Sequence, residues 1–114
     1  MTILEIFEKV NLVIPIEQRV FFNFFEDTVN ELQSLYGDFV FIEGKEYTPP
    51  ASLTDCEHEN VVLPLYHNSI VDNILFLANK GETYKGEFIR KSKDAYLKYW
   101  NDNAKGRRIR RMRW

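Results

Sequence analysis

The chain has 114 residues, 45% of them hydrophobic, and a formal net charge of −2 at pH 7. This length allows one domain with a modest core, and the apolar content favours a folded chain over a disordered one. Cys56 is the only cysteine, which excludes an internal disulfide. No apolar run is long enough to cross a bilayer, and the first residues lack the basic leader of a signal peptide, so we expect a cytoplasmic protein with no membrane partner.

The first predicted element is a short amphipathic helix that Thr2 and Glu5 can cap as a pair. Its apolar face consists of Ile3, Ile6, Phe7 and Val10. After Pro15, residues 16–36 predict a long second helix that ends at Gly37, a residue type common at C-caps. The apolar stripe of this helix consists of Phe21, Phe25, Val29, Leu32 and Tyr36.

The spacing of apolar residues is no longer that of a helix in the segment FVFIEGKEYTPP. Apolar residues at 39–42 and a turn sequence at 43–46 predict a short β-hairpin, and the two prolines that follow exclude a helix. Residues 61–63 predict a brief extended stretch. Pro64 then opens a third helix, whose buried stripe consists of Tyr66, Ile70, Ile74 and Leu77.

A last helix is predicted over residues 83–103, and Gly106 is expected to separate this helix from the residues that follow. One side of this helix carries Phe88, Ala95, Tyr96, Tyr99 and Trp100. The predicted fold class is therefore mainly α, a small four-helix bundle with a short β-hairpin between helices two and three. We expect residues 1–105 to form this helical domain and residues 106–114 to form a basic C-terminal arm.

The near-neutral total charge conceals an asymmetry between the two parts of the chain. Residues 1–79 hold three basic and thirteen acidic residues, a net charge of −10, whereas residues 80–114 hold twelve basic and four acidic residues, a net charge of +8. Such asymmetry indicates a chain whose two ends meet charged partners, or copies of the same chain, in different ways.

Residues suited to catalysis or metal binding are few. Cys56, His58 and His67 are too few and too irregularly spaced for a zinc site, and no orienting group accompanies the cysteine as a nucleophile. A cluster of acidic residues lacks the spaced loop pattern of a calcium site and is better explained as charged surface: Asp55, Glu57 and Glu59. We therefore predict no enzyme and no catalytic, cofactor or metal site.

The second helix carries more phenylalanine than one small core can bury. Phe21, Phe22, Phe24 and Phe25 cover more than half of the helix circumference. Most aromatic residues at helical spacing belong to a core, but a surplus indicates a second buried surface, which in a small chain means another subunit. We predict that Phe22 and Phe24 contribute to a subunit interface.

The order of these parts resembles the head-tail connector (adaptor, or head completion) proteins of tailed bacteriophages. The resemblance covers residues 2–104 and depends on four features. These are a short first helix, a long second helix ending in Tyr36-Gly37, the FVFIEGKEYTPP segment with Leu63-Pro64 before the third helix, and a basic aromatic fourth helix. The arginine-rich ending RRIRRMRW departs from the family pattern.

The resemblance implies a structural virion protein located in the phage neck and, during assembly, in the host cytoplasm. It implies a homo-oligomeric ring of twelvefold symmetry that joins the portal protein to the next neck or tail protein. Genomic DNA would pass through the channel of this ring without sequence-specific contact. Opposite charges on one chain agree with such a ring, because identical copies can attract one another head to tail.

The C-terminal segment KGRRIRRMRW has two interpretations. Arginine and tryptophan are frequent anchors of protein interfaces, which favours docking on the portal or on a neighbouring subunit. The predicted docking residues are Arg107, Arg108, Ile109, Arg110, Arg111, Met112, Arg113 and Trp114. The alternative is a small nucleic-acid-binding protein that uses the same arginines on phosphates, although the acidic remainder of the chain would repel a duplex.

Overall fold

The N-terminal helix begins with the capping pair that its sequence predicts. The computed structural model describes residues 2–42, 44–50, 60–78 and 81–111. Helix α1 spans Ile3–Val13. The Thr2 hydroxyl accepts a hydrogen bond from the Glu5 amide (3.2 Å), and the Glu5 carboxylate accepts one from the Thr2 amide (3.1 Å). This arrangement satisfies two amides that the helix itself leaves without partners.

Helix α2 (Gln18–Tyr36) starts two residues later than predicted and ends at the predicted cap. The Ile16 amide donates to the side-chain oxygen of Asn11 (3.1 Å), so this amide is bonded outside the helix. At the other end Gly37 has φ 64, a left-handed conformation that glycine adopts without strain. The buried face follows the predicted stripe: Phe21, Phe25, Thr28, Val29 and Leu32.

The β-hairpin predicted after α2 is absent, since the described residues contain no strand. Gly37–Val40 instead form the 3₁₀ turn η1. Phe41 then forms an isolated antiparallel bridge with Val62, and the Ile42 amide donates to the Val61 carbonyl (2.8 Å). The hairpin prediction is wrong because this segment pairs with the chain just before the next helix and not with the residues after its own turn.

The turn predicted within this segment is nevertheless present. Gly44 has φ 80, and the Lys45 amide donates to the Ile42 carbonyl (3.1 Å). Beyond the turn, the Tyr47 ring stacks on Phe41 with 5.4 Å between centroids. Side chains before and after the turn thus contact each other, although the described backbone forms no ladder of hydrogen bonds there.

The third helical region matches its prediction except at Leu77, which was expected in the buried stripe and is only partly buried. Pro64–Tyr66 form the 3₁₀ turn η2, and helix α4 follows as His67–Leu77. Most of its residues are buried, as expected for a central helix: His67, Ser69, Ile70, Asp72, Asn73, Ile74 and Leu75.

Helix α5 (Glu82–Arg111) is longer than predicted. The helix backbone passes through Gly106, so the predicted basic arm is not supported as a separate element. The physical reason is that one glycine costs a helix only about 1 kcal/mol relative to alanine, while the lysine and arginines beside it are good helix formers.

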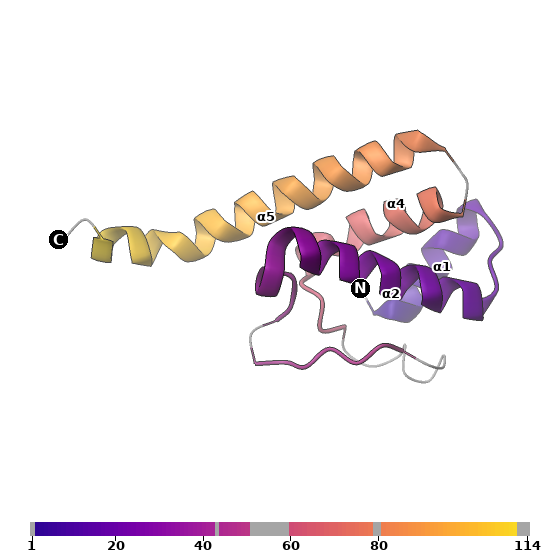
Figure 1. Ribbon diagram of the computed structural model, residues 1–114, viewed down its shortest axis with the longest axis horizontal. Helices are drawn as coiled ribbons and strands as arrows, with labels where there is room; N and C mark the ends of the chain where they lie inside the picture. Colours follow the sequence, from indigo (N-terminus) through magenta and orange to yellow (C-terminus); the bar gives the residue numbers. More distant parts are fainter. Residues whose placement is uncertain (1, 43, 51–59, 79–80, 112–114) are drawn as a thin grey trace.

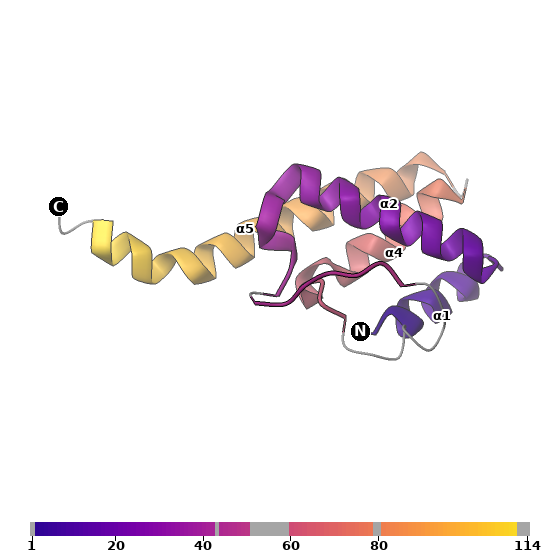
Figure 2. The same ribbon diagram turned by 60° about the horizontal axis from the view of Figure 1, so that its bottom comes forward.

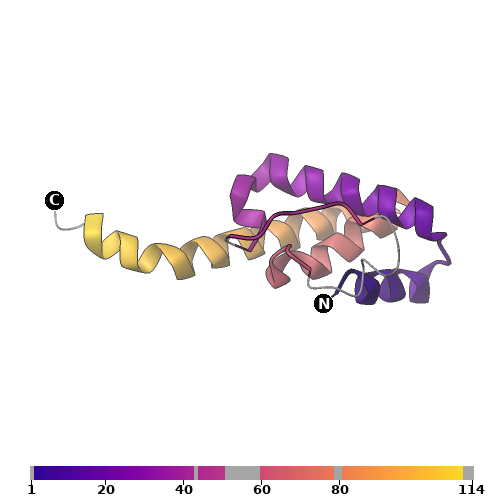
Figure 3. The same ribbon diagram turned by 90° about the horizontal axis from the view of Figure 1, so that it is seen from below.

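The helices form a bundle from which α5 extends (Figure 1). Helix α1 lies behind α2, and α4 and α5 run in opposite directions along the upper side of this view. The C-terminal part of α5 continues past the end of the bundle in all three orientations (Figures 2 and 3), giving dimensions of 55 × 31 × 20 Å. The turn between α1 and α2 lies at the opposite end of the long axis.

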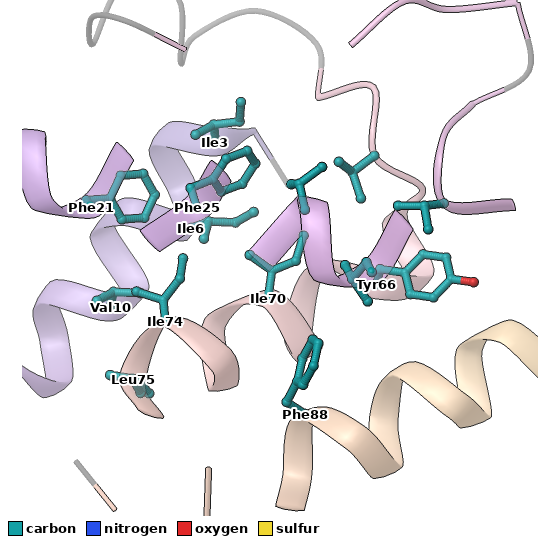
Figure 4. Packing of buried hydrophobic residues seen from close by; sticks show 14 of the residues in the cluster. Ile3, Ile6, Val10, Phe21, Phe25, Tyr66, Ile70, Ile74, Leu75 and Phe88 are labelled. Carbon is teal, nitrogen blue, oxygen red and sulfur yellow. The ribbon is translucent and has the colours of Figure 1, made fainter. Parts of the chain in front are cut away.

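All four helices contribute to one core (Figure 4). Phe21 and Phe25 from α2 face Ile6 from α1 and Ile70 from α4. Helix α5 contributes one large side chain that is fully buried, Phe88. Because α5 enters the core mainly through this ring, the attachment of the projecting helix depends strongly on it.

Candidate protein interaction site

A polar network fixes α5 against the rest of the bundle. Lys85 donates to the carboxylate of Glu31 on α2 (2.5 Å) and to the side-chain oxygen of Asn73 on α4 (3.1 Å). The Asn73 side-chain nitrogen donates in turn to the hydroxyl of Thr28 (2.8 Å). Asn73 and Thr28 are buried, so these bonds satisfy groups that would otherwise be costly to remove from water.

The Lys85 ammonium also lies over two aromatic rings. It is 4.8 Å from the centroid of Phe88 and 5.4 Å from that of Phe76. A second ion pair joins α4 to α5, with Lys91 Nζ 2.7 Å from a carboxylate oxygen of the buried Asp72. These polar contacts fix the orientation of α5 relative to α2 and α4, in addition to the apolar packing between the helices.

Aromatic rings line the place where α5 leaves the bundle. Tyr36, at the end of α2, stacks on Tyr96 of α5 (4.8 Å between centroids) and on Tyr66 (5.8 Å). The Tyr36 and Ser92 hydroxyls are hydrogen-bonded at 2.9 Å. Burial, together with the neighbouring tyrosines, raises the pKa of Tyr66, so this phenol stays neutral. The C-terminal end of α2 is thereby held beside the outgoing part of α5.

The outer side of α5 exposes a stripe of side chains. Ile89, Leu97 and Trp100 are 50%, 45% and 37% exposed, and Lys93 between them is exposed as well. The spacings of four, four and three residues place all four on one helix face. We call these four residues the outer stripe. It joins apolar area and positive charge on the helix that projects from the bundle.

A pocket of about 390 Å³ opens on the first half of α2. We call it the α2 pocket, and its lining residues are Gln18, Arg19, Phe22, Asn23, Glu26 and Pro50. Its wall combines one aromatic ring and one proline with polar groups, among them the exposed carboxylate of Glu26. This mixture suits an amphipathic side chain more than a purely apolar one.

The two predicted interface residues lie in different surroundings. Phe22 lines the α2 pocket, and its ring is 5.8 Å from that of Phe21 in an edge-to-face arrangement. Phe24 is also half-buried and packs against the core, but it does not line this pocket. Of the two, Phe22 is therefore the one that a ligand in the pocket would touch.

The predicted docking residues lie at the far end of α5. Positions 107–111 belong to the last part of the helix, whereas Met112, Arg113 and Trp114 lie outside the described residues. Helix α5 carries ten basic and four acidic residues. The positive charge predicted from the sequence is thus carried on a continuous helix that leads away from the bundle.

Most residues considered for metal or nucleophilic chemistry fall in a part of the chain that the structure does not describe. Cys56, His58 and the acidic positions Asp55, Glu57 and Glu59 lie outside the described residues. Within the described part of the chain, no group of three or more His, Cys, Asp or Glu residues could hold a metal ion. His67 is buried at the start of α4, where its Nε2 lies 2.8 Å from the Val62 carbonyl oxygen.

Burial lowers the pKa of His67 below the ordinary value near 6.5, although its bond to the Val62 carbonyl opposes this effect. As pH falls through 6.5, the unfolded chain gains this proton before the folded chain does. Stability should therefore be complete above about pH 7 and decline toward pH 5, by at most about 1.4 kcal/mol per pH unit. Thermal melts of a His58→Gln variant, in which His67 is the sole histidine, should show this decline. Adding His67→Gln should flatten the profile, and an unchanged slope would contradict the assignment.

Sequence reasoning missed both the polar network and the α2 pocket. One signal for the network was available, because Asn73 lies between apolar residues in IVDNILFL and Thr28 interrupts the apolar stripe of α2. Polar residues on a buried face require partners. The pocket had no such signal, because Pro50 joins its wall from a loop whose course the sequence does not specify.

Within the described residues no helix is both long and apolar enough to span a bilayer. Comparisons with models of protein families, with curated proteins and with solved structures found no match. The functional assignment therefore depends on the sequence pattern and on the geometry of these surfaces.

Proposed function

We propose that this protein is a structural subunit of the neck of a tailed bacteriophage. Copies would form a ring that joins the portal protein to the next neck or tail protein and extends the channel for DNA. The observation that carries this proposal is the projection of a basic helix from one end of the bundle. The first two helices of this bundle carry more acidic than basic residues. A subunit with two different ends is suited to repeated head-to-tail contacts.

The projecting part of α5 supplies the means of docking in this proposal. Residues 107–114 would bind carboxylates on the portal or on a neighbouring subunit through bidentate arginine pairs, with Trp114 as an apolar anchor. Many such contacts in a ring act together, so each one needs only modest affinity.

Assembly provides the direct test of the proposed function. The purified protein should form rings, alone or when mixed with portal-bearing heads, that negative-stain electron microscopy and light scattering detect. Heads incubated with the protein should gain additional density at the portal vertex. A protein that stays monomeric and never associates with heads would contradict the proposal.

Nucleic-acid binding is the second candidate function, and the extended basic helix favours it. A projecting helix rich in lysine and arginine can lie along a phosphate backbone. Against it, the four acidic residues of α5 and the acidic bundle reduce the net attraction. Fluorescence anisotropy with duplex DNA at several salt concentrations distinguishes this function from ring assembly.

A further inference from the structure

We propose that the outer stripe of one copy binds the α2 pocket of a second copy, with Trp100 as the side chain that enters the pocket. This inference rests on the proposed ring assembly and specifies which surfaces of the subunit meet. It assigns a role to Ile89, Lys93, Leu97 and Trp100 that is separate from docking by residues 107–114.

The chain cannot fill the α2 pocket with its own Trp100. Phe22 lines the pocket near the start of α2, whereas Tyr36 at the end of the same helix stacks on Tyr96 of α5. The helix rise between Phe22 and Tyr36 is about 21 Å. Trp100 lies four residues beyond Tyr96 on α5, and the C-terminal part of α5 leads away from the bundle (Figure 1). A Trp100 side chain that enters this pocket must therefore come from another copy.

The chemistry of the pocket matches a tryptophan. Phe22 and Pro50 offer apolar contact to an indole ring, and Glu26 and Asn23 offer oxygen atoms to its N–H group. A volume of about 390 Å³ is at the lower end of the range for small-molecule sites, which suits one large side chain. Trp100 is 37% exposed on its own bundle, so part of its ring is free to be buried.

The charges around the two surfaces are complementary. Lys93 lies in the middle of the outer stripe. The wall of the α2 pocket carries one carboxylate, Glu26, and one cation, Arg19, and the exposed Asp27 follows Glu26 in the sequence, so acidic groups outnumber basic ones there. Within the described residues, Lys93, Glu26 and Asp27 form no ion pair. Each can therefore pair with a second copy without losing a partner of its own, which favours association and fixes its register.

The α2 pocket and the Trp100 end of the outer stripe lie toward opposite ends of the subunit. The first half of α2 adjoins the turn from α1, and the outer stripe ends where α5 leaves the other end of the bundle (Figures 1 and 3). A contact between different surfaces is heterologous, so each bound copy leaves one pocket and one stripe open. Such a contact closes into a ring only if its rotation allows, and otherwise continues as a filament.

A charge exchange tests the pairing. Glu26→Lys and Lys93→Glu should each weaken self-association about tenfold in sedimentation equilibrium at low salt, because each places like charges together. An equimolar mixture of the two variants should recover association, since the reversed charges then face one another. Glu8→Lys changes an exposed carboxylate on α1 by the same charge and is the matched control. It should associate as the wild type does.

The apolar contact is tested in the same assay. Trp100→Ala should weaken association about thirtyfold, as expected for a buried interface anchor. Phe22→Ser should have a comparable effect, whereas Phe24→Ser should have little, because only Phe22 lines the pocket. Circular dichroism melts verify that each variant is folded, and the exposed charge variants keep the test valid if Phe22→Ser unfolds.

Several results would overturn the inference. A wild-type protein that is monomeric at all concentrations would do so, as would a mixture of charge variants that fails to recover association. Failure here is distinct from failure of the proposed function. Rings on portal-bearing heads that are unaffected by Glu26→Lys, Lys93→Glu and Trp100→Ala would refute this contact and leave the neck assignment in place. Self-association through this contact without any binding to heads would refute the neck assignment and leave this contact in place.

Discussion

Phe88→Ala is expected to lower the free energy of unfolding by about 3–5 kcal/mol, a large part of the stability of a domain of this size. Phe88 has no exposed surface and is the one large side chain that α5 buries completely in the described core. Its ring also contacts the Lys85 ammonium at 4.8 Å, so its removal weakens the polar network beside it. Chemical denaturation followed by circular dichroism measures the loss.

Phe76→Ala is the matched control for this prediction. Phe76 also lies under the Lys85 ammonium, but it is only partly buried. Its truncation removes the same kind of ring and creates less cavity, so the loss of stability should be clearly smaller. Equal losses for the two variants would show that the cation–π contact, and not burial, determines the effect. A loss below about 1 kcal/mol for Phe88→Ala would mean that α5 is not held by the core.

The helices and their buried faces could be predicted from the sequence because each depends on local spacing. Phe21, Phe25, Val29 and Leu32 recur at intervals of four and three, and all four have no exposed surface. The cap formed by Thr2 and Glu5 is equally local, and the structure contains it. In such cases the residues that decide the conformation lie within one or two turns of one another.

The predictions that failed depended on distant or weak determinants. Phe41 has the composition of a strand, but its bridge partner, Val62, comes from the other side of a long connection. Spacing along the chain does not identify such a partner. Gly106 does not end α5, because one glycine between lysine and arginine costs a helix little. Both signals are local propensities worth only about 1 kcal/mol, which tertiary contacts readily override.

The candidate interaction surfaces also combine features that local spacing predicts with features that depend on distant residues. A surplus of phenylalanine on α2 indicated a second buried surface, and Phe22 does line a pocket there. Pro50, which completes the pocket, comes from a loop whose course could not be inferred. The outer stripe was partly visible, because Trp100 was assigned to an apolar side of the last helix. Its exposure follows only from the path of α5 past the end of the bundle.

Deleting residues 107–114 is expected to abolish docking onto portal-bearing heads while leaving the fold intact. Residues 107–111 are the last residues of α5, beyond Phe88 and the tyrosine stack, so the core loses no side chain assigned to it. The five arginines and Trp114 of the deleted segment are the groups expected to bind the portal or a neighbouring subunit. Co-sedimentation with heads measures docking, and a thermal melt measures the fold. Trp114→Ala alone should weaken docking measurably.

Replacing the five arginines at 107, 108, 110, 111 and 113 by lysine provides a matched control, because it keeps the charge of the segment. Lysine cannot form the bidentate pairs that arginine makes with carboxylates, so docking on a protein surface should weaken strongly. Binding to DNA phosphates depends chiefly on charge and should change little. The docking assignment is wrong if the protein that lacks residues 107–114 docks normally but binds DNA more weakly than the full chain does. In that case the segment binds the genome, and DNA binding by the full chain should show a slope of log K against log salt near −4.5, for about five phosphate contacts.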